Sequence, residues 1–172
     1  RTGKWYWEVK VASLGGSSPV GLVGIGQADV ISQFDPGDSR HEKTGTSLGY
    51  RLGDGQTYYN DSTASFGNSF ALNDIWQCAW DADNGKVWFG KNNTWQNSGD
   101  PTSGATGTGA FSTTFSSSVN AGGGWGPTAS NEASDVYEAR FAEAEWSYSA
   151  PTGFKALCTE NLPEPAIKDG ST

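Results

Sequence analysis

The side chains that most often perform catalysis are scarce in this sequence. Its one histidine, His41, stands between Arg40 and Glu42 in a polar stretch, where no neighbouring pattern supplies the group that orients a general base. The two cysteines, Cys78 and Cys158, are too few for a metal cage or for a fold built on disulfides. We therefore predict no metal site and no cofactor, and whether the two thiols form a disulfide stays open.

Two pairs of acidic residues could resemble the catalytic pair of a glycosidase, since the members of each pair are two positions apart in the sequence. Glycosidases use two carboxylates about 5–10 Å apart. Asp81 and Asp83 fall in a predicted hairpin turn, where aspartate accepts hydrogen bonds from backbone N–H groups. Glu143 and Glu145 are predicted to share the solvent-facing side near a strand end. We interpret both pairs as structural, and the sequence therefore predicts a protein that is not an enzyme.

Aromatic side chains are better candidates for function, because an exposed ring can stack on a sugar or enter a pocket of a protein partner. Trp88 is predicted on the side of its strand that faces away from the apolar stripe, and Trp95 follows in the polar loop that leaves this strand. With Tyr58, and with Arg40 and His41 in a second polar loop, they form the candidate ligand-binding residues. One alternative for Trp88 is that the segment after it, rich in Ser, Thr and Gly, covers the ring.

The first element that positions these residues is a strand over 4–11, where apolar and polar residues alternate. Side chains of a strand point to opposite faces in turn. One face carries Tyr6 and Glu8, and we expect it to contact water. The other face is expected to pack into the core and carries Trp5, Trp7, Val9 and Val11.

The clearest hairpin joins residues 75–81 to residues 86–91 through the loop 82–85. Gly85 ends this loop and is predicted at positive φ, which glycine adopts without strain. The register that follows from this loop pairs Cys78 with Phe89, Trp80 with Val87, and Ala79 with Trp88.

The rest of the chain predicts further short strands and polar connections. The stretch 97–124, rich in Ser, Thr and Gly, is expected to be a long surface loop with at most one short strand. We expect an apolar segment at 151–157 to close the domain, after strands at 20–26, 46–52, 56–60, 125–129 and 136–141. Together these elements predict an all-β fold, a sandwich of two antiparallel sheets.

Composition and charge restrict the class of protein. The 172 residues suffice for one domain with one core, and 24 glycines argue against long helices. Eleven basic residues against 19 acidic ones give a net charge of −8, which repels nucleic acids and anionic lipids. No apolar run approaches the ~20 residues that span a membrane. We therefore predict neither a nucleic-acid partner nor membrane insertion.

Five sequence blocks, taken in order, resemble the SPRY domain family, which is related to B30.2 domains. They are Gly3–Lys10, Val23–Gly26, Gly49–Tyr50, Asp74–Asp81 and Gly85–Asn93. The resemblance runs to about the end of the predicted closing segment. It implies a bent β-sandwich of the concanavalin-like jelly-roll type, whose loops at one end hold a protein or a surface glycan.

Two segments, Lys91–Pro101 and Pro151–Pro165, resemble SPRY modules found in tail and virion proteins of bacteriophages. This resemblance implies a SPRY-like domain at 1–157, and a closing segment and linker at 158–172 that leads into a further domain of a larger protein. It implies a non-catalytic binding or structural module of a tail fibre or tail appendage, located in the virion or otherwise outside a cell or at its surface. Host surfaces, neighbouring virion proteins and further copies in a trimer are the partners it suggests. The stretch 102–124 departs from the family in its length, so no loop residue is assigned from the resemblance.

Two alternatives stand beside the phage module. One is a lectin or a glycan-processing domain of similar shape, which would show exposed tryptophans flanked by Asp or Asn, or a converging pair of carboxylates. The other is a SPRY protein of a cell, acting at its surface or as an adaptor, which the genes beside its own would identify.

Overall fold

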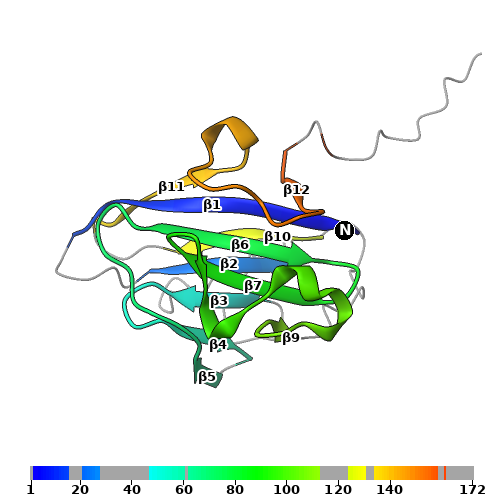
Figure 1. Cartoon of the computed structure of the whole chain (residues 1–172). Coiled ribbons are helices and arrows are strands. Elements are labelled where there is room, and N and C mark those ends of the chain that lie inside the picture. The colour runs from blue at the N-terminus through cyan, green and yellow to red at the C-terminus, as the bar shows by residue number, and fades with distance from the viewer. Residues whose placement is uncertain are drawn as a thin grey trace, which may run out of the picture.

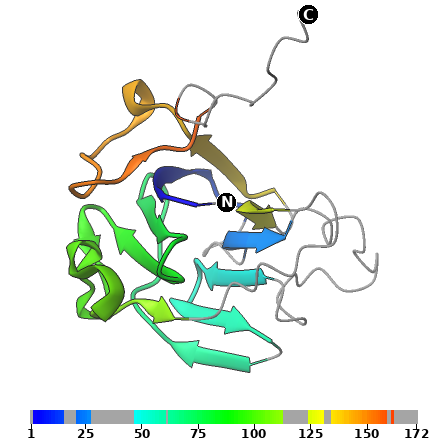
Figure 2. The ribbon, with the colours of Figure 1, turned by 90° about the vertical axis from the view of Figure 1, so that its right-hand side faces the viewer.

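The alternating residues 4–11 lie in strand β1 (Lys4–Ser13), which runs through the larger of two sheets. The structure is a computed structural model that describes residues 2–15, 21–27, 47–60, 62–112, 124–130, 134–158 and 161. Its two sheets pack face to face (Figure 1 and Figure 2). They confirm the predicted all-β sandwich.

Each sheet combines strands that are distant in sequence. Within the described residues, the larger sheet has the order β11 (Val136–Arg140), β1, β6 (Ile75–Asp81), β7 (Lys86–Lys91) and β8 (Thr94–Trp95), with β12 (Lys155–Ala156) beside β1 and β9 (Phe111–Ser112) beside β7. The smaller sheet has the order β10 (Trp125–Ser130), β2 (Leu22–Gln27), β3 (Ser47–Arg51), β4 (Gln56–Tyr59) and β5 (Ser62–Ser65). The described pairings are antiparallel apart from the parallel pairing of β1 with β12.

Strand β1 has neighbours along both of its edges. Strand β6 lies along one edge, while β11 and β12 share the other edge. Glu8 stands opposite Arg140 of β11, and Trp5 stands opposite Lys155 of β12. One edge of β1 is therefore hydrogen-bonded to strands that come more than a hundred residues later in the chain.

The hairpin of β6 and β7 has the predicted register, with Cys78 opposite Phe89, Trp80 opposite Val87 and Ala79 opposite Trp88. Gly85 has a φ of 62°, as predicted for the end of this turn. The predicted strands 46–52 and 56–60 also pair as a hairpin, with Gly55 at a φ of 73° between β3 and β4, as suits a tight turn.

Replacing Gly85 by valine is expected to destabilise the protein by about 1–3 kcal/mol, because a β-branched residue at positive φ is strained. The Gly85→Asn variant is the matched control, since asparagine adopts this backbone region more readily, and it should cost less. Urea unfolding of both variants measures the difference. Equal unfolding midpoints for the two would contradict the importance of this backbone conformation.

The core lies between the inner faces of the sheets. Its buried residues include those predicted to face inward in β1 and β6, namely Trp5, Trp7, Val9, Val11, Cys78 and Trp80. The inner face of the smaller sheet contributes Val23, Ile25, Leu48 and Tyr50. Burial raises the pKa of the Cys78 thiol, and Cys78 and Cys158 are both free thiols.

The outer face of β1 differs from the expectation. Tyr6 and Glu8 were expected to contact water, but both side chains are completely buried. The reason is a covering layer formed by residues 141–157, which belongs to the orange segment above β1 in Figure 1. Both faces of β1 are therefore buried, although its sequence alternates between apolar and polar residues.

A second segment, residues 96–110, covers the outer face of β7. It contains the helical turns η3 (Gln96–Ser98) and η4 (Pro101–Thr106), so this part of the expected surface loop is packed against the sheet. Residues 113–123 of the expected loop lie outside the described residues. Another short turn, η5 (Glu143–Glu145), belongs to the covering layer of β1. None of the helical elements described here has the length and apolar character needed to cross a membrane.

Candidate functional site

The covering layer of β1 is held by one buried carboxylate. Glu8 accepts hydrogen bonds from the backbone N–H groups of Ser147 at 2.7 Å and Tyr148 at 2.9 Å. It also accepts one from the hydroxyl of Tyr6 at 2.9 Å. These three donors replace the water that a carboxylate loses on burial, and hydrogen bonds to a charged group are the stronger kind.

The hydrogen bonds continue from Glu8 across the sheet. The Nε2 of Gln77 donates to the Tyr6 hydroxyl at 2.9 Å, and the backbone N–H of Asn93 donates to the Oε1 of Gln77 at 2.6 Å. Burial raises the pKa of the Tyr6 phenol, so its proton stays available for the bond to Glu8. The chain of polar groups thus links the covering layer to the turn between β7 and β8.

Aromatic contacts and a second glutamate complete the layer. The ring of Trp146 meets that of Tyr6 edge-on, with centroids 4.7 Å apart, and its indole N–H donates to the Arg140 carbonyl at 3.2 Å. The Oε2 of Glu145 accepts from the backbone N–H groups of Phe141 and Ala142 at 3.1 and 3.0 Å. The course of the backbone through this layer is therefore fixed at several points.

A pocket of about 610 Å³ opens in this layer. It is lined by residues 146–156 together with Glu143 and Asn161, and we call it the 143–156 pocket. Figure 2 shows the yellow-to-orange chain that carries it, on the outer side of β1. The volume falls within the range of about 300–1,000 Å³ that is common for sites of small ligands.

The residues predicted to bind a ligand are not brought together as expected. Trp88 is completely buried, and its indole N–H donates to the Thr108 carbonyl at 2.8 Å. The expectation of an exposed ring is wrong, and the alternative that the following segment covers it is confirmed. The ring of Phe154 also lies beside it, with centroids 6.3 Å apart. Trp88 therefore has no exposed surface for a ligand.

The other predicted residues are divided between different places. Trp95 is half-buried and packs in the same apolar cluster as Trp88. Tyr58 is buried on the smaller sheet, opposite Gly49, where its hydroxyl accepts a hydrogen bond from Arg51 at 2.9 Å. The two remaining candidates, Arg40 and His41, lie outside the described residues.

The first carboxylate pair has the structural role that the sequence predicts. Asp81 is buried and accepts hydrogen bonds from the backbone N–H and the Nδ2 of Asn84 at 3.1 and 2.8 Å. Lys4 lies 3.4 Å from it, and Asp83 accepts from the backbone N–H of Gly3 at 2.9 Å. Both aspartates thus stabilise the end of the β6–β7 hairpin.

The second pair lies in the turn η5, shortly after the end of β11, and both glutamates are exposed as predicted. Glu145 is occupied with backbone N–H groups, whereas Glu143 is exposed and lines the pocket. Among the described residues, no three His, Cys, Asp or Glu side chains are grouped closely enough to hold a metal ion.

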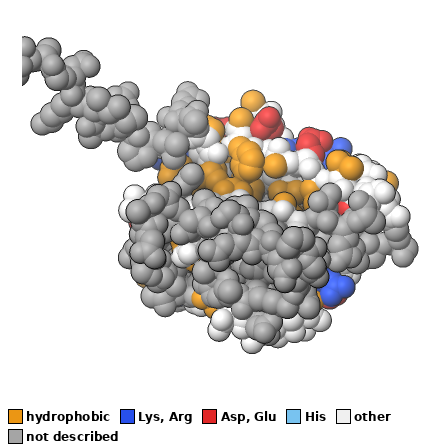
Figure 3. All heavy atoms as spheres, turned by 180° about the vertical axis from the view of Figure 1, so that it is seen from behind, with side chains coloured by type: hydrophobic (Ala, Val, Ile, Leu, Met, Phe, Trp, Pro, Cys, Tyr) orange, Lys and Arg blue, Asp and Glu red, His pale blue; other side chains and the backbone are white. Residues whose placement is uncertain are grey.

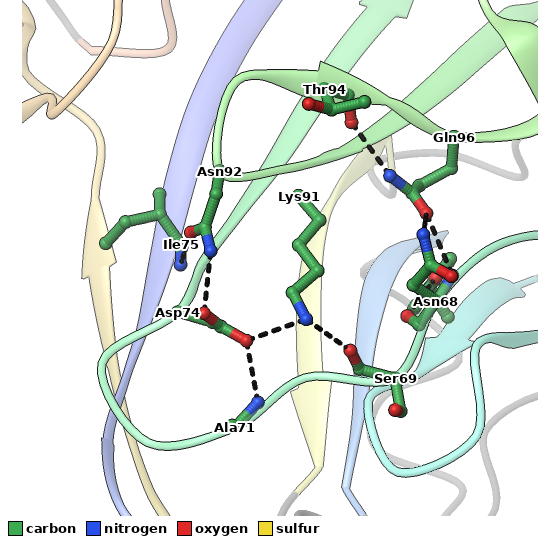
Figure 4. A network of polar contacts seen from close by, with 10 residues as sticks. Asn68, Ser69, Ala71, Asp74, Ile75, Lys91, Asn92, Thr94 and Gln96 are labelled. Atoms are coloured by element: carbon green, nitrogen blue, oxygen red, sulfur yellow. Dashed lines mark hydrogen bonds and ion pairs between the residues drawn. The ribbon is translucent and has the colours of Figure 1, made fainter.

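Another polar network joins the connection before β6 to the turn after β7 (Figure 4). Lys91 contacts the Oδ2 of Asp74 at 2.9 Å and donates to the Ser69 carbonyl at 2.6 Å. Asn92 donates to the Oδ1 of Asp74 at 2.6 Å, and Gln96 accepts from the backbone N–H of Asn68 at 2.8 Å. Because these groups satisfy one another, we interpret the network as a clamp between two loops and not as a binding site.

Partial burial alone raises the pKa of Asp74, but the hydrogen bonds from Lys91, Asn92 and the Ala71 N–H outweigh it, so the pKa of Asp74 is lowered. A carboxylate with a lowered pKa stabilises the folded state above its unfolded pKa, near 3.8, and loses this contribution as the pH falls through the folded value. The Asp74→Asn variant should therefore be less stable than the parent at neutral pH, with a difference that shrinks below pH 3.8. Urea unfolding across this pH range measures it, and a difference independent of pH would contradict the clamp.

In the described part of the chain, exposed apolar residues do not offer an alternative site. Leu72 and Val136 are the large apolar side chains that are exposed in the described part of the chain, each by 51%. Figure 3 shows apolar side chains on the back of the molecule bordered by acidic and basic ones. Exposed apolar residues of this kind are normal on protein surfaces.

Sequence reasoning missed Trp146 and Tyr148 of the covering layer, whereas Phe154 belongs to the segment 151–157 that was predicted to close the domain. The stretch between β11 and β12 shows neither strand alternation nor a helical period, yet it is rich in aromatic residues. Aromatic side chains in an irregular segment must pack against something, since each carries a large apolar surface. This signal could have predicted that the segment covers the outer face of a sheet.

Comparison with known proteins gives a family for most of this chain. The sequence model described as the SPRY domain matches residues 4–125, so the segment that lines the 143–156 pocket lies after the matched part. No curated protein sequence matches the chain. The solved structure of the SPRY domain of human HERC1 is similar, with a TM-score of 0.57 and 19% sequence identity over 81% of this chain and 75% of that one. At this identity, the similarity concerns the fold.

Proposed function

Because the chain belongs to the SPRY family, we propose that it is a non-catalytic binding module carried in a tail fibre or tail appendage of a bacteriophage virion. SPRY domains are generally protein-interaction modules, and the matched residues 4–125 contain most strands of both sheets. This membership is the observation that carries the binding role. We place its partners on a host surface or among neighbouring virion proteins, with a trimer as the assembly of the full-length protein.

The phage setting is supported by the two segments that resemble modules of virion proteins, Lys91–Pro101 and Pro151–Pro165. The first contains β8, whose Trp95 packs in the cluster of Trp88, and η3, which contacts β7. The second begins in the wall of the 143–156 pocket. The first segment and the described residues 151–158 of the second therefore lie in the two layers that cover the larger sheet.

A non-catalytic role is supported by the arrangement of carboxylates. Glu143 is the only carboxylate among the pocket-lining residues that the structure describes. Glu145, two residues further along the chain, already accepts two backbone hydrogen bonds. A glycoside hydrolase needs a second carboxyl group free to act on the same sugar. The glycan-processing alternative therefore receives less support than a binding role.

The genome that encodes the chain provides the test of the setting. We expect its reading frame to lie among genes for tail proteins, and we expect mass spectrometry of purified virions to detect its peptides. Antibodies against the protein should label the tail in electron micrographs. A reading frame among cellular genes, with no peptide in virions, would instead support the alternative of a cellular surface or adaptor protein.

A further inference from the structure

We propose that the 143–156 pocket binds an uncharged saccharide. This inference rests on the binding role proposed above and assigns a site and a ligand class to it. The pocket lies after the residues that match the family, so the assignment rests on the chemistry of its lining.

The pocket is lined by polar side chains that the protein does not use for itself. Within the described residues, the side chains of Tyr148, Ser149 and Thr152 make no hydrogen bond, and those of Glu143 and Lys155 make neither a hydrogen bond nor an ion pair. The network of Figure 4 is the opposite case, since its polar groups satisfy one another. Several donors and acceptors in one concave site can thus be offered to a ligand.

The charges and hydroxyls of the pocket favour a neutral ligand with many hydroxyl groups. One carboxylate, Glu143, and one ammonium group, Lys155, leave the lining without net charge. An anionic ligand would be repelled by the carboxylate of Glu143, and a cationic ligand would be repelled by the ammonium group of Lys155. The hydroxyls of Tyr148, Ser149 and Thr152 can both donate and accept, which suits the hydroxyl groups of a sugar.

Aromatic rings add surfaces on which a sugar ring can pack. Trp146 and Tyr148 are half-buried, and both line the pocket. A peptide ligand typically gains its affinity from an anchor that fills an apolar pocket. Here the large apolar residue Phe154 is buried against Trp88, and apart from Trp146 and Tyr148 the other lining side chains are small, polar or charged. The observations therefore favour a saccharide over a peptide.

The wall of the pocket is rigid before a ligand arrives. Glu8 fixes the backbone of Ser147 and Tyr148 by hydrogen bonds, and Glu145 fixes the turn beside Glu143. A site held in this way loses little conformational freedom on binding. This favours recognition of a weakly interacting, well-hydrated ligand.

The test is titration of the ¹⁵N-labelled protein with glucose, galactose, mannose and N-acetylglucosamine, followed by amide NMR spectra. At least one sugar should shift the amides of residues 146–156 in a saturable manner. The Tyr148→Phe and Thr152→Ala variants should each weaken this binding by about three- to tenfold, the scale of one net hydrogen bond. The matched control is Thr63→Ala, which removes an exposed hydroxyl from β5 and should leave the binding unchanged.

Three results would overturn the proposal: no saturable shift with any of the four sugars, shifts confined to another surface, or unchanged binding by both pocket variants. A library of random peptides forms a parallel arm, and peptide binding at these amides without any response to sugars would assign the pocket to a protein partner. Detection of the chain in virions, together with no sugar response, would leave the proposed function standing and remove this inference alone.

Discussion

Replacing Trp88 by alanine is expected to destabilise the protein by about 3–5 kcal/mol, the cost of emptying a fully buried tryptophan site. The ring lies between the outer face of β7 and the segment 96–110, and its N–H satisfies the Thr108 carbonyl. The variant therefore loses packing in two layers and leaves a carbonyl without its partner. Urea unfolding monitored by circular dichroism measures the loss of free energy.

A suitable control for Trp88→Ala is Leu72→Ala, which removes a large apolar side chain that is 51% exposed. The control should change the free energy of unfolding by less than about 0.5 kcal/mol. If both variants unfolded at the same urea concentration as the parent, Trp88 would be uncovered in solution, and its assignment as an exposed binding residue would be restored.

The second large effect is expected for Glu8→Ala, which should cost about 3 kcal/mol, because it leaves one buried and two partly buried donors without an acceptor. Two of these donors are the N–H groups of Ser147 and Tyr148, and the third is the Tyr6 hydroxyl. The loss should be concentrated in the covering layer. Hydrogen exchange should therefore become faster at Ser147 and Tyr148 before it does in the strands of the core.

Glu138→Ala serves as the comparison for Glu8→Ala, since it removes a glutamate whose side chain is exposed and pairs with Arg140. Surface ion pairs contribute little, so this variant should stay close to the parent in stability. Unchanged exchange rates at Ser147 and Tyr148 in the Glu8→Ala protein would show that Glu8 does not hold the layer.

The two sheets could be predicted because local patterns determine them. The alternation of β1 identified Trp5 and Trp7 as core residues, and the turn ending in Gly85 determined the register that places Trp80 opposite Val87. A period of two residues and a positive φ are properties of short segments. These local properties do not depend on how the rest of the chain folds.

The covering layers could not be predicted from the same patterns. Alternation divides a strand into two faces but does not reveal that a distant segment will bury the polar face, as residues 147 and 148 bury Glu8. For the same reason, the strand register of Trp88 was predicted correctly, but its side chain was wrongly predicted to be exposed. The 143–156 pocket was missed because irregular backbone forms it, and irregular backbone has no period to detect.

The arrangement of β1 also has a consequence for synthesis on the ribosome. Strand β1 is made well before β11 and β12, which pair one of its edges and end at Ala156. At the usual speed of about 5–20 residues per second, that edge waits roughly 10–30 s for its partners. During this interval an open edge beside Trp5 and Trp7 can pair with another nascent chain. Slow translation or crowded polysomes should therefore lower the yield of native protein, and a chaperone that binds extended aromatic segments should restore it.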